Sequence, residues 1–231
     1  MKIFIKILFL SPVKAFYPFN CLANFPSLKY TYGMNYNAEM NRIIESFNGE
    51  RRTILLHACC APCSSACLER LKDAFDITLY FYNPNIEDAE YVKRKKELER
   101  LAEETGWAKI IDCDHDESEF YSAVNGFENC AEGGERCFKC FHLRLDATAK
   151  RAKEGGYNYF ATTLTLSPLK NADKINEIGE ELAKEYGVKW LYSDFKKQNG
   201  YLRSIQLSAE YNLYRQNYCG CVFSSSKQTA R

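Results

Sequence analysis

Apolar and polar positions alternate along the chain in two rhythms that predict a regular succession of strands and helices. Short apolar runs bounded by turn signals are typical of buried strands, whereas apolar side chains at every third or fourth position indicate helices. The first rhythm predicts strands at 53–57, 77–82, 107–112, 157–163 and 188–192. The second predicts helices at 41–47, 62–74, 91–105, 117–124, 137–154, 173–186 and 201–216.

Strands that alternate with helices favour a parallel sheet with right-handed crossovers. We therefore predict an α/β fold, a parallel sheet with flanking helices of Rossmann-like type, as one domain over residues 34–223. Residues 224–231 are predicted to form a flexible polar tail. Ligands of such sheets lie beyond the carboxyl ends of the strands. The segments expected at that edge are the Cys59-Cys60 turn, Asn83, Cys113 and the Thr162-Thr163 turn.

The N-terminal segment has a mixed character. Its first ten residues, MKIFIKILFL, open like a signal peptide, but Lys6 interrupts the apolar run and no clear small-residue cleavage site follows. Three prolines then break any long helix, and the run is too short to span a membrane. We expect residues 1–33 to be either a disordered extension or a mis-called start, with Met34 beginning the functional chain.

Charge and cysteine content narrow the class of function. The 31 Lys and Arg residues nearly balance the 30 Asp and Glu residues, so no global basic charge indicates a nucleic-acid binder. The chain contains 11 cysteines, an odd number, and most of them cluster as CC, CxxC and CxC. This usage predicts metal or redox chemistry in a reducing compartment, the cytoplasm, rather than a disulfide framework.

The turn after the first strand contains the most informative cysteines. Neighbouring Cys59 and Cys60 rarely bind one tetrahedral ion without strain, whereas a cubane offers separate iron atoms to separate sulfurs. Cys137 and Cys140 form a CxxC pair one helical turn apart. Together these cysteines supply the four thiolates of a [4Fe-4S] cluster. The alternative is a structural zinc site with four cysteine ligands.

The remaining cysteines allow more than one role. Cys219-Gly220-Cys221 predicts either a strained, easily reduced disulfide or two ligands of a second metal. Cys63 is near enough to the turn to be a further ligand, while Cys67 is expected to be a buried apolar residue. Cys113 and Cys130 are expected to be structural or incidental, and His57 to be a buried histidine that could support the cluster ligands.

The first strand-to-helix turn has no glycine-rich phosphate loop, which disfavours nucleotide binding there. Basic residues near the cysteine motifs form either phosphate contacts for an RNA with unpaired bases or a solvated charged surface. They are Arg136, Lys139, Arg144, Lys170, Lys196, Lys197, Arg203 and Arg215.

Six motifs together resemble one family. They are HACCAPCS at 57–64, FYNPNI at 81–86 followed by Glu90, Tyr91 and Arg94, GERCFKCFHLRL at 134–145, FATTLTLSPLK at 160–170, DFKKQNGYLRS at 194–204 and YRQNYCGC at 214–221. In this order they resemble the QueH-type epoxyqueuosine reductases, and the similarity covers about residues 34–224.

The resemblance implies a HUP-type α/β fold and an oxidoreductase of tRNA processing. Its expected reaction is the reduction of epoxyqueuosine to queuosine at the wobble position of tRNAs with GUN anticodons. It assigns a [4Fe-4S] cluster to Cys59, Cys60, Cys137 and Cys140. It assigns the catalytic role to Cys219, Cys221 and Cys63: Cys219 and Cys221 form a redox-active disulfide, or they bind a mononuclear iron together with Cys63. The electron donor, unknown, is expected to be ferredoxin-like or flavodoxin-like, and no membrane is involved.

Two other hypotheses remain at this stage. A tRNA-thiolating ATPase of HUP type would also use an iron-sulfur cluster, but it needs a pyrophosphate loop that ACCAPCSS lacks. A zinc-stabilised RNA-binding module would have no catalytic activity.

Overall fold

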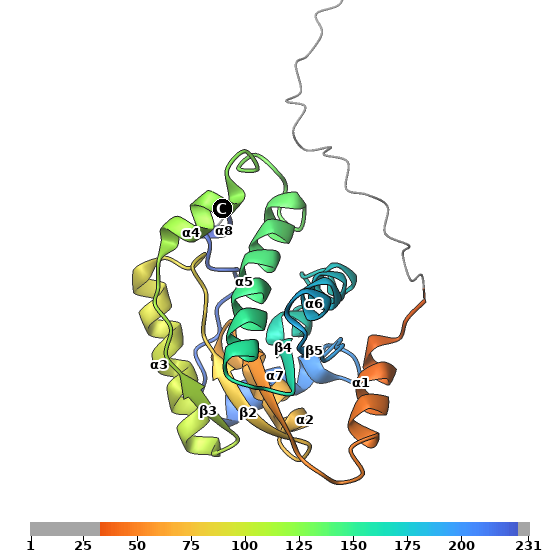
Figure 1. The fold of residues 1–231 in the computed structure, drawn as a ribbon. Coiled ribbons are helices and arrows are strands. Elements are labelled where there is room, and N and C mark those ends of the chain that lie inside the picture. The colour runs from red at the N-terminus through yellow and green to blue at the C-terminus, as the bar shows by residue number, and fades with distance from the viewer. Residues whose placement is uncertain (1–32, 226–231) are drawn as a thin grey trace, which may run out of the picture.

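The computed structural model describes residues 33–225 as one α/β domain built on a five-stranded, all-parallel sheet (Figure 1). The strand order is β3-β2-β1-β4-β5, which is a Rossmann-like order and confirms the predicted fold class. The strands are β1 (Arg52–His57), β2 (Phe75–Tyr80), β3 (Ala108–Ile111), β4 (Tyr159–Thr162) and β5 (Lys189–Trp190).

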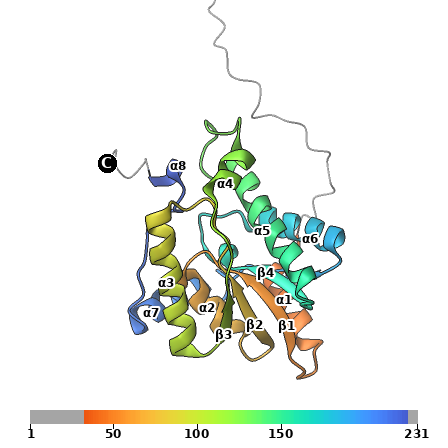
Figure 2. The same ribbon diagram turned by 60° about the vertical axis from the view of Figure 1, so that its left-hand side comes forward.

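Helices cover both faces of the sheet (Figure 2). Helices α2, α3 and α7 lie on one face, and α5 and α6 lie on the other, as right-handed crossovers on either side of a central β1 require. The helices are α1 (Tyr36–Glu45), α2 (Ala61–Leu71), α3 (Asp88–Thr105), α4 (Glu117–Val124), α5 (Glu135–Glu154), α6 (Ala172–Tyr186), α7 (Gly200–Glu210) and α8 (Val222–Ser225), with the 3-10 helix η2 (Thr163–Leu166).

The central strand is apolar because both of its faces are covered. Ile54, Leu55 and Leu56 are fully buried, and β1 pairs with β2 on one side and β4 on the other. Such continuous burial is the usual condition of a strand inside a parallel sheet. Its last residue, His57, pairs with Tyr80 and Thr162, so β1, β2 and β4 end level with one another. The cysteine turn begins directly beyond this common edge.

The predicted last helix is too long. It was expected over 201–216, but α7 ends at Glu210. Asn212 adopts a positive φ of 47°, which ends the helical path, and Arg100 on α3 donates to the carbonyl oxygens of Tyr211 and Asn212. The chain then runs along α3 to α8, which lies next to α4 (Figure 2). This return brings the CGC motif to the carboxyl edge of the sheet.

The predicted terminal segments fall largely outside the described residues. The structure does not describe residues 1–32, which include Cys21 and nearly all of the predicted N-terminal extension, or residues 226–231, which make up most of the predicted tail. Ser224, placed in that tail by the sequence pattern, is buried in α8, and its Oγ accepts a hydrogen bond from the Cys219 backbone N–H at 3.2 Å. Among the helices of residues 33–225, none is long and apolar enough to cross a membrane.

Candidate metal and redox centre

The turn after β1 brings three thiols together. Cys60 has an extended backbone, with φ −175°, and serves as the N-cap of α2, whose first turn contains Pro62. The sulfurs of Cys59, Cys60 and Cys63 all lie within 4.8 Å of one another, and the Cys59 and Cys60 sulfurs are 3.8 Å apart. The three sulfurs are close enough to bind one metal ion, whereas the sequence analysis expected Cys59 and Cys60 to contact separate irons of a cluster.

The three thiols have different proton affinities. Hydrogen bonds from the thiols of Cys60 and Cys63 hold the pKa of Cys59 well below its ordinary value. The hydrogen bonds have the opposite effect on the two donors. The bond that Cys60 donates to Cys59 raises the pKa of Cys60 to about 12, and the bond that Cys63 donates to Cys59 raises the pKa of Cys63. Cys59 is therefore the thiolate of the turn, and thiolates are the form that binds metal.

Thr163 supports this thiolate from the neighbouring strand end. Its Oγ1 accepts a hydrogen bond from the Cys59 backbone N–H at 3.3 Å and lies 3.5 Å from the Cys59 sulfur, to which it donates. The predicted Thr162-Thr163 turn is thus part of the site, as its place beyond β4 suggested. Cys67 is fully buried, and its thiol donates to the Cys63 carbonyl oxygen, which confirms its expected structural role.

The CxxC pair stands at the start of α5. Gly134 is the N-cap, so Cys137 lies in the first turn, where its sulfur accepts a hydrogen bond from the Gly133 backbone N–H at 3.2 Å. Cys140 is buried in an apolar cluster with Cys221. Burial raises the pKa of Cys137 and raises that of Cys140 to about 11. A metal would have to displace these protons.

Arg144 joins the start of α5 to the end of β1. Its Nε donates to His57 Nε2 at 3.2 Å, its Nη2 donates to Asn83 Oδ1, and its Nη1 lies 4.0 Å from the Cys140 sulfur. Burial, followed by the positive charge of Arg144, lowers the pKa of His57 to about 3. His57 is therefore neutral, and it underlies the site rather than binding a metal, as expected.

The CGC segment reaches the same region. Cys219 and Cys221 are both free thiols in this structure. A hydrogen bond from Cys221 lowers the pKa of Cys219 well below its ordinary value, and the ammonium of Lys170, 4.0 Å from the Cys219 sulfur, also lowers it. The pKa of Cys221 is raised by the same bond.

Charge interactions through Cys219 link the three sets of predicted site cysteines. The charge of Cys219 contributes to the raised pKa of both Cys137 and Cys140, and the charge of Cys59 raises the pKa of Cys219. Among the cysteines of residues 33–225, however, only Cys59, Cys60 and Cys63 are grouped tightly enough for one ion. The sulfurs of the predicted set of four, Cys59, Cys60, Cys137 and Cys140, are therefore not all within 4.8 Å of one another.

The predicted basic residues divide into two groups. Arg136 and Arg144 are buried and donate within the domain, Arg203 pairs with Glu69 and Glu210, and Arg215 donates to Ser204 and Ser208. These arginines stabilise the fold. Lys170 is directed at Cys219 instead. Sequence reasoning named Lys170 only as an anion contact, and it gave Arg94 no role in the site beyond its place in a motif.

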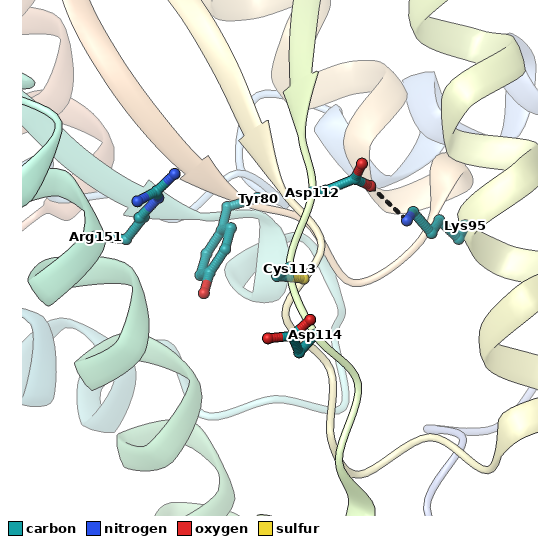
Figure 3. A pocket seen from close by; sticks show the side chains of 6 residues that line it. All are labelled: Tyr80, Lys95, Asp112, Cys113, Asp114 and Arg151. Atoms are coloured by element: carbon teal, nitrogen blue, oxygen red, sulfur yellow. Dashed lines mark hydrogen bonds and ion pairs between the residues drawn. The ribbon is translucent and has the colours of Figure 1, made fainter.

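A separate cavity of about 570 Å³ opens at the ends of β2 and β3 (Figure 3). Lys95 and Asp112 form an ion pair at 2.7 Å on one side, and Arg151 on α5 lies on the other. Tyr80 and Cys113 form the wall between them. The Cys113 thiol lies 3.7 Å from the Tyr91 hydroxyl, and burial raises its pKa, in keeping with its expected structural role.

A Rossmann-like sheet with three sets of cysteines at its carboxyl edge defines a class of protein, an α/β enzyme that uses thiols for metal or redox chemistry. A family model described as Epoxyqueuosine reductase QueH matches residues 54–227. The chain belongs to this family, whose members are oxidoreductases.

Curated relatives are similar over most of their length. The epoxyqueuosine reductase QueH of Staphylococcus epidermidis is 45% identical over 205 residues, which cover 84% of this chain and 86% of the relative. That of Thermotoga maritima is 38% identical over 175 residues, which cover 74% of this chain and 90% of the relative. A solved structure, the U34-tRNA thiolase NcsA from Methanococcus maripaludis with its [4Fe-4S] cluster, is 14% identical, covers 81% of this chain and 67% of that chain, and has a TM-score of 0.48.

Proposed function

We propose that this chain reduces epoxyqueuosine to queuosine at wobble position 34 of tRNA, the final step of queuosine biosynthesis. The observation that carries the proposal is the meeting of the cysteine turn, the CxxC helix and the CGC segment at one sheet edge, in a member of this family. The reaction removes the epoxide oxygen as water and leaves a cyclopentene. It therefore consumes two electrons and two protons.

Cys59, Cys60, Cys137 and Cys140 would hold a [4Fe-4S] cluster. When bound, the cluster supplies single electrons at the site. The charges of the surrounding residues fit an anionic group: Arg144 and Lys170 face these sulfurs, and neither forms an ion pair with a carboxylate within residues 33–225. Buried or partly buried cations without acidic partners are costly, and a thiolate-bound group would balance them.

Cys63, Cys219 and Cys221 would form the second part of the centre. One form of this proposal is a mononuclear iron held by the three sulfurs; the other is a redox-active disulfide between Cys219 and Cys221. The lowered pKa of Cys219, caused first by its bond to Cys221, supports either form because both need a thiolate at this position. Gly220, with φ +105°, gives the turn a backbone conformation that glycine adopts readily.

Lys170 is proposed to act on the oxygen that leaves. Burial lowers its pKa, but the charges of Cys219 and Cys59 outweigh this effect and hold the pKa above its ordinary value, so Nζ carries a proton. An ammonium at this place can donate a hydrogen bond to the epoxide oxygen as negative charge develops on it. The Nζ proton is thus available where the C–O bond breaks.

The substrate would be a tRNA with a GUN anticodon, and base 34 must leave the anticodon stack to reach thiols at the bottom of this edge. The reductant is proposed to be a ferredoxin-like or flavodoxin-like protein, because the chemistry needs low-potential electrons delivered singly. The proposed place of reaction is the cytoplasm, where tRNA and reduced thiols coexist.

The direct test is conversion of epoxyqueuosine in tRNA by the anaerobically purified protein with a chemical reductant, followed by nucleoside mass spectrometry. The expected product has lost one oxygen atom. Cys219→Ser and Cys221→Ser should each abolish conversion, whereas the matched variant Cys113→Ser should retain it. If cluster-loaded protein never converts the substrate under any reductant, the proposed function is wrong.

A further inference from the structure

Arg94 is the most deeply buried cation of α3. Its side chain is 2% exposed, and its Nε donates to Glu90 Oε1 at 2.7 Å, one helical turn away. A guanidinium this deeply buried persists only where its hydrogen-bonding groups are satisfied or serve a purpose. Glu90 is also within 3.4 Å of the Tyr214 hydroxyl, so the pair already contacts the segment that leads to the CGC motif.

Arg94 is also the residue against which the CGC motif packs. Its Nη1 donates to the Cys219 carbonyl oxygen at 2.9 Å, and its guanidinium lies 5.1 Å from the Tyr218 ring centroid. Gly220 makes this approach possible. A Cβ at position 220 would come within 2.9 Å of Arg94 Nη1, and the positive φ of 105° disfavours any other residue. The glycine of the motif is therefore explained by Arg94 as well as by the turn.

One part of the guanidinium has no partner. Arg94 Nη2 is buried and has no acceptor at hydrogen-bonding distance among the described residues, and the guanidinium otherwise contacts the side chain of Tyr218. An orphaned buried N–H group destabilises the folded protein, and it does so more strongly when it is charged. Burial lowers the pKa of Arg94, but the hydrogen bond to Glu90 and the charges of Cys60 and Cys59 outweigh burial and raise the pKa above its ordinary value. The charges of the cysteine turn therefore act on this guanidinium.

We propose that Arg94 is a positioning residue that holds the Cys219-Gly220-Cys221 segment against α3 and directs its Nη2 hydrogen to a sulfur of the iron-sulfur group bound by the cysteine turn. The proposal rests on the proposed function in so far as it takes such a group to be present. It explains in one step the buried ion pair, the glycine and the orphaned donor. Hydrogen bonds to the sulfurs of such a group stabilise its reduced, more negative form and raise its reduction potential.

Arg94→Lys separates this role from simple charge balance. Lysine keeps a positive charge for Glu90 but cannot bond Glu90, Cys219 and a sulfur at once. In the anaerobic holoprotein we expect unchanged cluster content, a midpoint potential more negative than that of the wild type, and faster alkylation of Cys219 and Cys221 by iodoacetamide. Arg42→Lys on α1, which disturbs an exposed pair with Glu39, is the matched control and should change none of these.

Gly220→Ala tests the same contact from the other side and leaves Arg94 intact. The added Cβ should push the CGC segment off the guanidinium, so alkylation of Cys219 should rise as in Arg94→Lys. Gly126→Ala is the matched control, since Gly126 also has a positive φ, 82°, but a Cβ there meets nothing within 4 Å. The effects of Arg94→Lys and Gly220→Ala on alkylation should not add, because both break one contact.

The proposal is overturned if Arg94→Lys keeps the wild-type potential, or if Gly220→Ala alkylates at the rate of Gly126→Ala. Both readouts are measured on the resting protein without tRNA. The two proposals can fail separately. If the wild-type protein holds the cluster but does not convert epoxyqueuosine, while Arg94→Lys and Gly220→Ala show the expected shifts, the proposed function is wrong and the role of Arg94 stands.

Discussion

The pKa values of the cysteines at this edge are determined by neighbouring side chains rather than by residue type alone. Among the thiols, Cys59 and Cys219 have a lowered pKa, and each receives a hydrogen bond from an adjacent cysteine whose own pKa is raised. A CC or CxC pair thus produces one thiolate and one thiol from two chemically identical residues. Lys170 and Arg144 supply the positive charge that favours the thiolate form.

Loss of the Lys170 ammonium should lower turnover more than binding. Lys170→Met is expected to decrease kcat about 100-fold with little change in KM, because the lost hydrogen bond matters only as the oxygen becomes negative. Single-turnover assays of the cluster-loaded variant measure the effect. Lys184→Met, which removes an exposed ion pair with Glu180 on α6, should behave as the wild type. Wild-type kcat in Lys170→Met would exclude this role.

His57 should make stability depend on pH. Because burial and then Arg144 lower its pKa from 6.5 to about 3, the unfolded chain takes up a proton before the folded chain does as the pH falls. This contribution to the free energy of unfolding is complete above pH 6.5 and is lost between about pH 6.5 and 3, at about 1.4 kcal/mol per pH unit.

Urea unfolding at a series of pH values below 6.5 tests this origin. The decline in His57→Gln should be shallower by about one proton, since glutamine does not titrate. His142→Gln, an exposed site, should retain the wild-type slope. An unchanged slope in His57→Gln would show that other groups dominate.

At the scale of elements, the strands and most helices follow from the apolar pattern because one buried face suffices to specify each of them. The extent of α7 does not, since its end depends on Arg100 of α3 reaching the carbonyl oxygens of Tyr211 and Asn212. The short helices η2 and α8 were also missed. Each has four residues, too few for a period to show.

The candidate site could also be predicted only in part from the sequence. Clustered cysteines are visible in the sequence because their spacing is local. The roles of Lys170 and Arg94 are not, because their contacts with Cys219 join residues 49 and 125 positions apart. Only the fold brings such pairs together, and a lysine or an arginine has no spacing that marks it beforehand.

The packing of α6 on β5 gives a prediction at this scale. Gly179 faces Trp190, and a Cβ there would lie 2.3 Å from the indole ring. Asn176 fixes the ring through a 3.0 Å hydrogen bond from Trp190 Nε1, so the ring cannot easily move away. Gly179→Ala should therefore destabilise the fold by about 1–3 kcal/mol, measured by urea unfolding. Lys184→Ala on the exposed face of α6 is the control, and equal stability of the two variants would contradict this packing.

For the whole molecule, the parallel sheet makes a single site from three distant segments. The turn after β1, the start of α5 and the return from α7 each end at the carboxyl edge. The last of these follows α3 and is held to it by the hydrogen bond from Arg94 to the Cys219 carbonyl oxygen. Formation of the centre should therefore depend on the native fold.

The central claim is that Cys59, Cys60, Cys137 and Cys140 hold an iron-sulfur cluster beside a separate CGC site. Iron, acid-labile sulfide and zinc analysis of anaerobically purified wild type, Cys137→Ser and Cys219→Ser tests it most directly. We expect sulfide with at least as much iron and no stoichiometric zinc in the wild type, loss of sulfide in Cys137→Ser, and its retention in Cys219→Ser. Stoichiometric zinc without sulfide in the wild type, or sulfide lost from Cys219→Ser but kept by Cys137→Ser, would contradict it.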